Sequence, residues 1–182
     1  NITMIDLDSE MTRICSEDEV ISALNEGSLD SDRVTIINMD AYKYLEDCDK
    51  KYDVIIVDLP DPNNEALAKL YSNIFYRMCG NALAPGGVLN VQSTSPYYAT
   101  KSFWCVTKTL ESEGFVVSPY HLQVPAFGDW GFNMAVKPDN DMVEGDRISY
   151  ENIRIDSVIE TKYLTEDIIQ SLFRFGKDES HS

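Results

Sequence analysis

The sequence lacks long hydrophobic runs and is poor in basic residues. No stretch of its 182 residues approaches the roughly 18 apolar residues of a membrane-spanning helix. Lys and Arg number 15 against 31 Asp and Glu, which gives a formal net charge of −16. Binding to a phosphate backbone needs clustered Lys and Arg, so this balance argues against a nucleic-acid-binding protein. It suits a small cationic ligand better, although most of the acids are expected to form a solvated surface.

The cysteines lack any spacing typical of a metal site or a disulfide framework. They are scattered along the chain at Cys15, Cys48, Cys79 and Cys105. Such cysteines are expected to be thiols of a reducing compartment, which predicts a cytoplasmic domain. A signal peptide is also missing, and because the chain opens directly on a predicted strand we expect further sequence before residue 1. With 43% apolar residues the chain is long enough to bury the core of one domain.

The stretch from Tyr52 to Pro62 is the one around which the other elements are organised. The β-branched apolar run from Val54 to Val57 lies between polar residues and prolines, which predicts a strand buried on both faces of a parallel sheet. Asp58 and Asp61 follow it directly. Ligands of doubly wound folds bind outside the carboxyl ends of strands, so both carboxylates are expected at the mouth of a site. The alternative is that they merely end a strand and begin a proline-stiffened turn.

Strands and helices alternate along the rest of the chain, which predicts an α/β fold. Further strands are expected at residues 1–7, 33–39, 88–91, 115–124, 130–136 and 153–159, with 115–124 and 130–136 antiparallel. Helices are expected from a Ser9 cap to Gly27, at 41–47, 66–79 and 96–113, and after a Thr165 cap. We expect residues 1–140 to form one domain, with 141–182 as its extension.

Carboxylates end each of the first three predicted strands, at Asp6 (followed by Asp8), Asp40 and Asp58. In a parallel sheet these strand ends share one edge, so the acids are expected to converge on one crevice. A carboxylate ending such a strand can accept hydrogen bonds from both ribose hydroxyls of a nucleoside. Another can accept a bond from an adenine amino group. For Asp6 and Asp8, the alternative is helix capping and stabilisation of the helix dipole.

Three motifs in order resemble the polyamine aminopropyltransferases, the spermidine synthase family. Asp58-Leu-Pro-Asp61-Pro is similar to the family's catalytic loop, and Gln92 lies where the family tends to carry Gln. The sequence Gly-Asp-Trp130-Gly-Phe is similar to a Gly-x-Trp-Gly-Phe pattern of bacterial members. The resemblance runs from Ile2 to about Lys137, with a familiar tail at 162–178. It implies a Rossmann-like fold with the sheet of S-adenosylmethionine-dependent methyltransferases, and is strongest to proteins in which this domain follows a membrane region.

The resemblance implies aminopropyl transfer from decarboxylated S-adenosylmethionine, without a metal, to a diamine such as putrescine. It implies that Asp6, Asp8, Asp40 and Ala41 bind the donor. The acceptor amine arrives protonated, and a carboxylate within hydrogen-bond reach can take its proton; Asp58 is our candidate for that base.

The same resemblance places the acceptor beside Asp61, Gln92 and Trp130. The indole of Trp130 can hold methylenes and an ammonium group, although a core position is nearly as well supported. Gln92 can equally be a plain amide at the end of a strand. Asp129 is a weaker candidate for the distal amine, and His121 is expected to be a satisfied core histidine.

Departures from the family pattern concern the acceptor and the donor sites. The chain has Asn63-Asn64 after Asp-Pro instead of a Gly-Pro-Ala-like turn, and Phe127 where a Tyr is common. The glycine-rich loop and the hairpin before it are absent, so we expect an N-terminally truncated sheet that is inactive alone. The first strand would then pair with the strand at Val54, or a second copy would cover the gap. The rival functions are a methyltransferase and a non-catalytic polyamine-binding domain.

Overall fold

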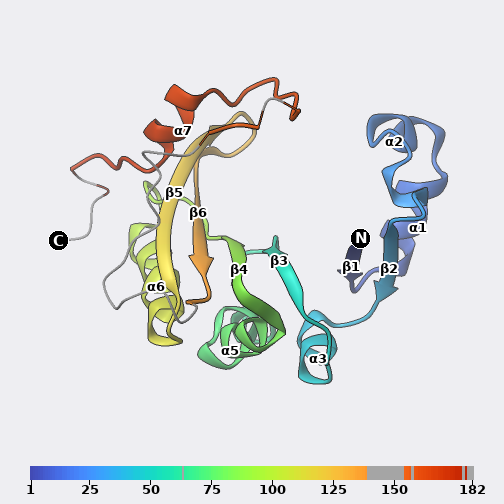
Figure 1. Cartoon of the computed structure of the whole chain (residues 1–182), viewed down its shortest axis with the longest axis horizontal. Coiled ribbons are helices and arrows are strands. Elements are labelled where there is room, and N and C mark those ends of the chain that lie inside the picture. Colours follow the sequence, from blue (N-terminus) through green and yellow to red (C-terminus); the bar gives the residue numbers. More distant parts are fainter. Residues whose placement is uncertain (63, 139–153, 157, 178, 180–182) are drawn as a thin grey trace. The chain divides into compact units, whose positions relative to one another are not determined.

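The computed structural model describes residues 1–62, 64–138, 154–156, 158–177 and 179 (Figure 1). The chain divides into two compact units, Asn1–Asp49 and Lys50–Ser182. The expected domain boundary at residue 140 lies outside the described residues, so that division stays a prediction.

The first unit is a pair of parallel strands with short helices. Its elements are β1 (Ile2–Asp6), α1 (Ser9–Glu17), α2 (Glu19–Leu24), a 3₁₀ helix (Ser28–Asp30), β2 (Val34–Asn38) and α3 (Ala41–Glu46). The β1–β2 ladder runs from Ile2 opposite Val34 to Asp6 opposite Asn38. Both strands therefore end at the same edge of the sheet.

The expected single helix from Ser9 to Gly27 is wrong in two respects. Asp8 is its cap, because the Asp8 carboxylate accepts hydrogen bonds from the backbone N–H groups of the first turn. Asp18 then ends α1 and caps α2, accepting from the N–H groups of Val20 and Ile21 at 3.0 Å. The cap at Asp18 divides the helix in two, although the spacing of the apolar residues continues across it.

The second unit is a mixed sheet of four strands in the order β3-β4-β6-β5. Strands β3 and β4 are parallel, whereas β6 is antiparallel to both of its neighbours, β4 and β5. The elements are β3 (Tyr52–Val57), α4 (Glu65–Ala68), a 3₁₀ helix (Lys69–Tyr71), α5 (Asn73–Ala82), β4 (Leu83–Gln92), α6 (Thr100–Ser112), β5 (Val116–Val124), β6 (Gly128–Val136) and α7 (Glu166–Leu172). This α/β order is that of the expected Rossmann-like, methyltransferase-type sheet, and the antiparallel pairing of β5 with β6 is confirmed.

Some expected boundaries in this unit are wrong. The helix expected at 66–79 is divided at Ser72, whose hydroxyl accepts from the N–H of Phe75 at 3.3 Å and so caps α5. Residues 154–156 and 158–159 form no strand, while 153 and 157 lie outside the described residues. The Thr165 cap of α7 is confirmed by its bond from the N–H of Ile168.

The core of the second unit lies between the sheet and two helices. Helix α5 packs on β4, α6 packs on β5 and β6, and the two helices contact each other, so they cover one face. The fully buried side chains there include Phe75, Tyr76, Leu83, Leu89, Phe103 and Leu110.

Strand β3 is buried on one face only, contrary to the expectation. Val57 is buried, but Val54 is 55% and Ile56 is 71% exposed. These two side chains alternate with Ile55 and Val57, so they point to the face opposite the inner side of the strand. In the described part of the chain β3 pairs with β4, and β1 pairs with β2. Because β1 and β3 belong to different compact units, the expected pairing of the first strand with β3 stays a prediction.

Candidate active site

The candidate catalytic loop begins where β3 ends. Asp58 follows Val57 directly and is exposed, and Asp61 is half-buried. Val57 lies opposite Val91 in the parallel β3–β4 ladder, so Asp58 and Gln92 follow at the same edge of the sheet. The structure thus brings three of the expected residues, Asp58, Asp61 and Gln92, to one place.

A hydrogen-bond chain joins this loop to β4. The Nε2 group of Gln92, a buried residue, donates to Oδ1 of Asp61 at 3.1 Å. The amide oxygen of Gln92 lies 3.1 Å from the hydroxyl of Tyr71, and that hydroxyl also lies 3.0 Å from the backbone carbonyl of Leu59. Tyr71 therefore contacts both the loop and the amide.

Tyr71 is the site residue that the sequence did not reveal. In the sequence it belongs to an apolar helical pattern and looks like a core residue. The structure places it at the end of a 3₁₀ helix with its hydroxyl toward the loop. Burial, and then the nearby charges of Asp61 and Asp58, raise the pKa of Tyr71, so the hydroxyl stays protonated at neutral pH. The apolar spacing of residues 67–78 fits a Tyr71 side chain in the core as well as one beside the loop. Only the fold therefore shows that Tyr71 belongs to the site.

A cavity of about 270 Å³ opens beside the loop. Asp61, Tyr71 and Thr94 line it together with Lys101 and Cys105 of α6. Its volume is close to the lower end of the roughly 300–1,000 Å³ of small-ligand pockets. Among the residues that line it, Lys101 brings the single positive charge and Asp61 the single negative charge. Asp58, Gln92 and Trp130 are not among its lining residues.

The backbone beyond Gln92 is strained and tightly packed. Thr94 has a φ of 60°, a left-handed conformation that is rare for a β-branched residue and costs energy. Its carbonyl accepts from the N–H of Gly131 at 2.7 Å, and the N–H of Ser93 donates to the carbonyl of Gly131 at 2.9 Å. A Cβ on Gly131 would lie 2.4 Å from the ring of Phe103. Close packing therefore explains the second glycine of the Gly-x-Trp-Gly-Phe pattern.

Trp130 lies at the same edge of the sheet as Gln92. Gln92 pairs with Phe132 in the antiparallel β4–β6 ladder, so Trp130 is two residues beyond the end of β4. Its half-buried ring packs against Phe127, with 5.1 Å between ring centroids. An aromatic pair at this edge is suited to a cationic aliphatic chain, although no described contact joins it to Asp61.

His121 is satisfied on both sides, as the sequence predicts. Its Nδ1 lies 2.7 Å from Oδ1 of Asp129 and its Nε2 lies 2.8 Å from the carbonyl of Arg174. The ring also stacks on Phe175. Burial lowers the pKa of His121, but the Arg174 carbonyl and Asp129 raise it more, so the pKa lies above its ordinary value. Asp129 is thus engaged by His121, which weakens it as a candidate for the distal amine.

His121, Asp129 and Glu179 form the cluster of the described residues that comes nearest to a metal site. Their potential ligand atoms lie within 4.8 Å of one another. Both ring nitrogens of His121, however, already face oxygen acceptors. A backbone carbonyl and a carboxylate both accept hydrogen bonds, so both ring nitrogens are placed to donate. This is the arrangement of a protonated histidine rather than of a metal ligand.

The candidate donor-binding residues lie in the first unit. Asp6 ends β1, and its Oδ1 accepts from the N–H of Asp8 at 2.7 Å. Asp40 caps α3, which begins at Ala41, and accepts from the N–H of Tyr42 at 2.8 Å. The β1–β2 register places Asp6 and Asp40 at the same edge of that pair of strands. A carboxylate has about four lone-pair sites, so the bond from Asp8 leaves Asp6 capacity for a ribose hydroxyl.

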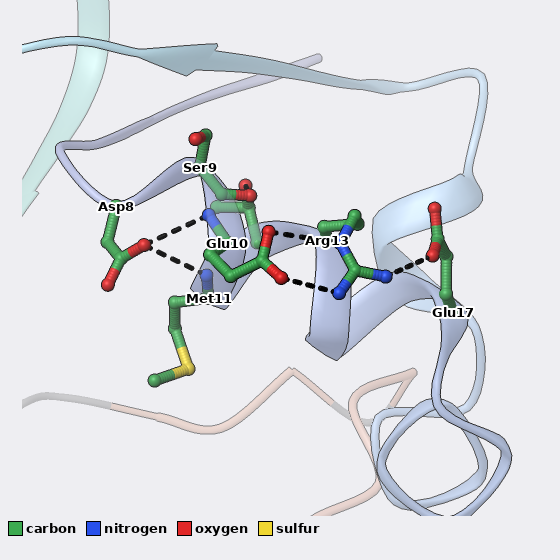
Figure 2. Close-up of polar contacts among 7 residues, drawn as sticks. Asp8, Ser9, Glu10, Met11, Arg13 and Glu17 are labelled. Carbon is green, nitrogen blue, oxygen red and sulfur yellow. Dashed lines mark hydrogen bonds and ion pairs between the residues drawn. The ribbon is translucent and has the colours of Figure 1, made fainter.

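Asp8 has the capping role that the sequence offered as the alternative. Figure 2 shows its carboxylate facing the backbone N–H groups of Glu10 and Met11, at 2.9 and 3.1 Å. One turn further on, Arg13 is bound between Glu10 and Glu17 at 2.6 Å (Figure 2). The cap accounts for one oxygen of Asp8, and its role toward a donor stays a prediction.

The two groups of acids belong to different compact units. Asp6, Asp8 and Asp40 lie in Asn1–Asp49, and Asp58 and Asp61 lie in Lys50–Ser182. Their convergence on one crevice stays a prediction. In the described residues no helix is both long and apolar enough to cross a membrane.

Sequence comparisons identify the family. A sequence model described as the spermine/spermidine synthase domain matches residues 1–146. A polyamine aminopropyltransferase of Oceanobacillus iheyensis is 41% identical over 181 residues, covering 98% of this chain and 33% of the relative. A polyamine aminopropyltransferase of Leptospira interrogans is 44% identical over 135 residues, 74% of this chain and 27% of the relative. The chain therefore spans about a third or less of the length of these relatives.

Solved structures show the same fold at lower identity. A spermidine synthase in complex with the transition-state analogue AdoDATO matches with a TM-score of 0.75 at 20% identity, covering 96% of this chain and 58% of that chain. The spermidine synthase of Thermotoga maritima matches with a TM-score of 0.72 at 21% identity, covering 96% and 57%. The chain has the Rossmann-like fold of these spermidine synthases. It belongs to the spermine/spermidine synthase domain family.

Proposed function

We propose that this protein transfers an aminopropyl group from decarboxylated S-adenosylmethionine to a diamine such as putrescine. The observation that carries the proposal is the loop after β3, in which Asp61 bonds to Gln92 while Asp58 stays exposed beside them. The family and the names of the relatives support the same reaction. The solved spermidine synthase in complex with the transition-state analogue AdoDATO supports the choice of donor.

Asp58 acts as the general base. The acceptor arrives as an ammonium ion, and Asp58 takes one proton to expose the nitrogen lone pair. The amine nitrogen then attacks the propyl carbon beside the sulfonium. A carbon–nitrogen bond forms, the carbon–sulfur bond breaks, and its electron pair neutralises the sulfur as a thioether. The product keeps the positive charge as a secondary ammonium, and Asp58 releases its proton to water.

Asp61, Gln92 and Trp130 hold the acceptor. Asp61 has its second carboxylate oxygen available for an ammonium group, because the hydrogen bond from Gln92 uses Oδ1. The second hydrogen of the Gln92 amide and its oxygen lie at the same edge. The Trp130 ring attracts the aliphatic chain and a flanking cation.

Asp6, Asp8, Asp40 and Ala41 bind the donor, with Asp6 toward the ribose and Asp40 toward the adenine. The reaction needs no metal, because the sulfonium is already a good leaving group. We also infer a cytoplasmic location, because the cysteines are free thiols. We further infer that the whole protein pairs with a second copy and is tethered to a membrane.

The test compares two donors on the purified whole protein. With putrescine as acceptor, decarboxylated S-adenosylmethionine should yield spermidine and a thioether nucleoside, whereas ordinary S-adenosylmethionine should yield neither. Methylated product from the ordinary donor would replace the proposal with a methyltransferase. Binding of the diamine without turnover on either donor would replace it with a polyamine-binding domain.

A further inference from the structure

The orientation of the Gln92 side-chain amide is fixed by the hydrogen-bonding groups of neighbouring residues. An amide can rotate by half a turn and exchange its oxygen and nitrogen in almost the same space. Asp61, as a carboxylate, can only accept, so the Gln92 nitrogen faces it at 3.1 Å. The oxygen then points the other way, toward the hydroxyl of Tyr71.

Tyr71 supplies the donor that completes this arrangement. Its hydroxyl lies 3.1 Å from the amide oxygen of Gln92 and 3.0 Å from the carbonyl of Leu59. Both of these oxygens are acceptors, so the hydroxyl hydrogen is shared between them. If the amide were reversed, its oxygen would face the negative Asp61 carboxylate and would lose the hydrogen bond that it accepts from Tyr71. Tyr71 and Asp61 therefore select the same orientation from opposite sides.

The contact with Leu59 extends this role to the loop itself. Leu59 follows Asp58 and lies between the two carboxylates. The loop and the 3₁₀ helix Lys69–Tyr71 are thus joined at the point where the carboxylates are presented. Because burial and the charges of Asp61 and Asp58 raise the pKa of Tyr71, the hydroxyl remains a donor throughout the working range of an enzyme.

We propose that Tyr71 is a positioning residue of the acceptor site, whose hydroxyl orients the Gln92 amide and holds the loop between Asp58 and Asp61 at Leu59. This inference rests on the proposed function, because it assigns Tyr71 to the half of that site that receives the amine. The donor half is not affected. Loss of the hydroxyl should therefore change the kinetic constants for the amine and leave those for the donor unchanged.

The chain offers a matched control for removal of this hydroxyl. Tyr76, a buried residue of α5, has a hydroxyl without a hydrogen-bond partner among the described residues. Tyr71→Phe and Tyr76→Phe each remove one hydroxyl oxygen, from a half-buried ring and from a buried ring respectively. Only Tyr71→Phe removes hydrogen bonds, those to the Leu59 carbonyl and the Gln92 amide oxygen.

The experiment measures steady-state kinetics of the whole protein with both substrates varied. Tyr71→Phe should lower kcat/KM for the amine about three- to tenfold, the scale of one lost hydrogen bond, at unchanged KM for the donor. Tyr76→Phe should match the wild type. In a Gln92→Met background, Tyr71→Phe should have less than about half of its effect on a logarithmic scale, because the group it orients is gone.

The outcomes separate this inference from the proposed function. A folded wild type that transfers no aminopropyl group would remove the proposed function, and the Tyr71 inference with it. Wild-type turnover together with an equal rate for Tyr71→Phe would overturn the inference alone. So would an undiminished Tyr71→Phe effect in the Gln92→Met background, or loss of folding in Tyr71→Phe while Tyr76→Phe stays folded.

Discussion

Gly131→Ala should destabilise the second unit and disturb the edge where Gln92 lies. An added Cβ would meet the Phe103 ring at 2.4 and 2.6 Å and the carbonyl of Thr94 at 2.8 Å. Real Cβ atoms essentially never approach so closely, and Phe103 is fully buried in the core with little room to move. Overpacking of this kind typically costs about 1–3 kcal/mol. The shift would also strain the bonds that join Gly131 to Ser93 and Thr94.

The assay is urea unfolding of the whole protein, with Gly80→Ala as the control. A Cβ on Gly80 would lie 3.2 Å from the end of the Phe115 ring. Gly80 lies inside α5, where alanine recovers roughly 0.5–1 kcal/mol of helix propensity and offsets this contact. Gly80→Ala should therefore stay within about 1 kcal/mol of the wild type. Equal stability of Gly131→Ala and the wild type would refute the packing argument.

Two further predictions concern the donor site and pH. Asp6→Ala and Asp40→Ala should each weaken binding of decarboxylated S-adenosylmethionine by about 1.5–3 kcal/mol, the scale of a hydrogen bond to a charged group, and calorimetry giving equal affinities would remove them from the site. His121 faces Asp129, Glu179 and the Arg174 carbonyl, and its pKa is raised in the folded state. Its contribution to the free energy of unfolding is therefore complete below the ordinary histidine pKa. This contribution is lost as pH rises through the pKa of the folded state. Denaturation between pH 5 and 9 should show this loss in the wild type and not in His121→Gln; parallel pH profiles would contradict it.

The sequence predicts much of the fold and of the loop, because both depend on local patterns. A β-branched run marks β3, and prolines mark the turn that presents Asp58 and Asp61. The end of β4 then brings Gln92 to the same edge, as the parallel arrangement requires.

The features that the sequence did not predict depend on contacts between distant residues or on a choice between two possible helix caps. Asp8 rather than Ser9 caps α1, since both residue types are good caps and the pattern does not choose between them. The exposure of Val54 and Ile56 depends on which residues cover that face of the strand, and an apolar run does not predict this. Tyr71 has the spacing of a core residue, and only the return of the chain toward Leu59 makes it part of the site.

Single-turnover transfer by Asp58→Asn, with Asp53→Asn as the control, tests the general-base role of Asp58 most directly. Both residues are exposed acids flanking the same run of β3, and they lie at opposite ends of it. An amide fills the space of a carboxylate but cannot take a proton from the amine. Asp58→Asn should lower the rate of aminopropyl transfer roughly 10²–10⁴-fold at unchanged donor affinity, while Asp53→Asn should retain the wild-type rate. Near-normal transfer by Asp58→Asn would contradict that role.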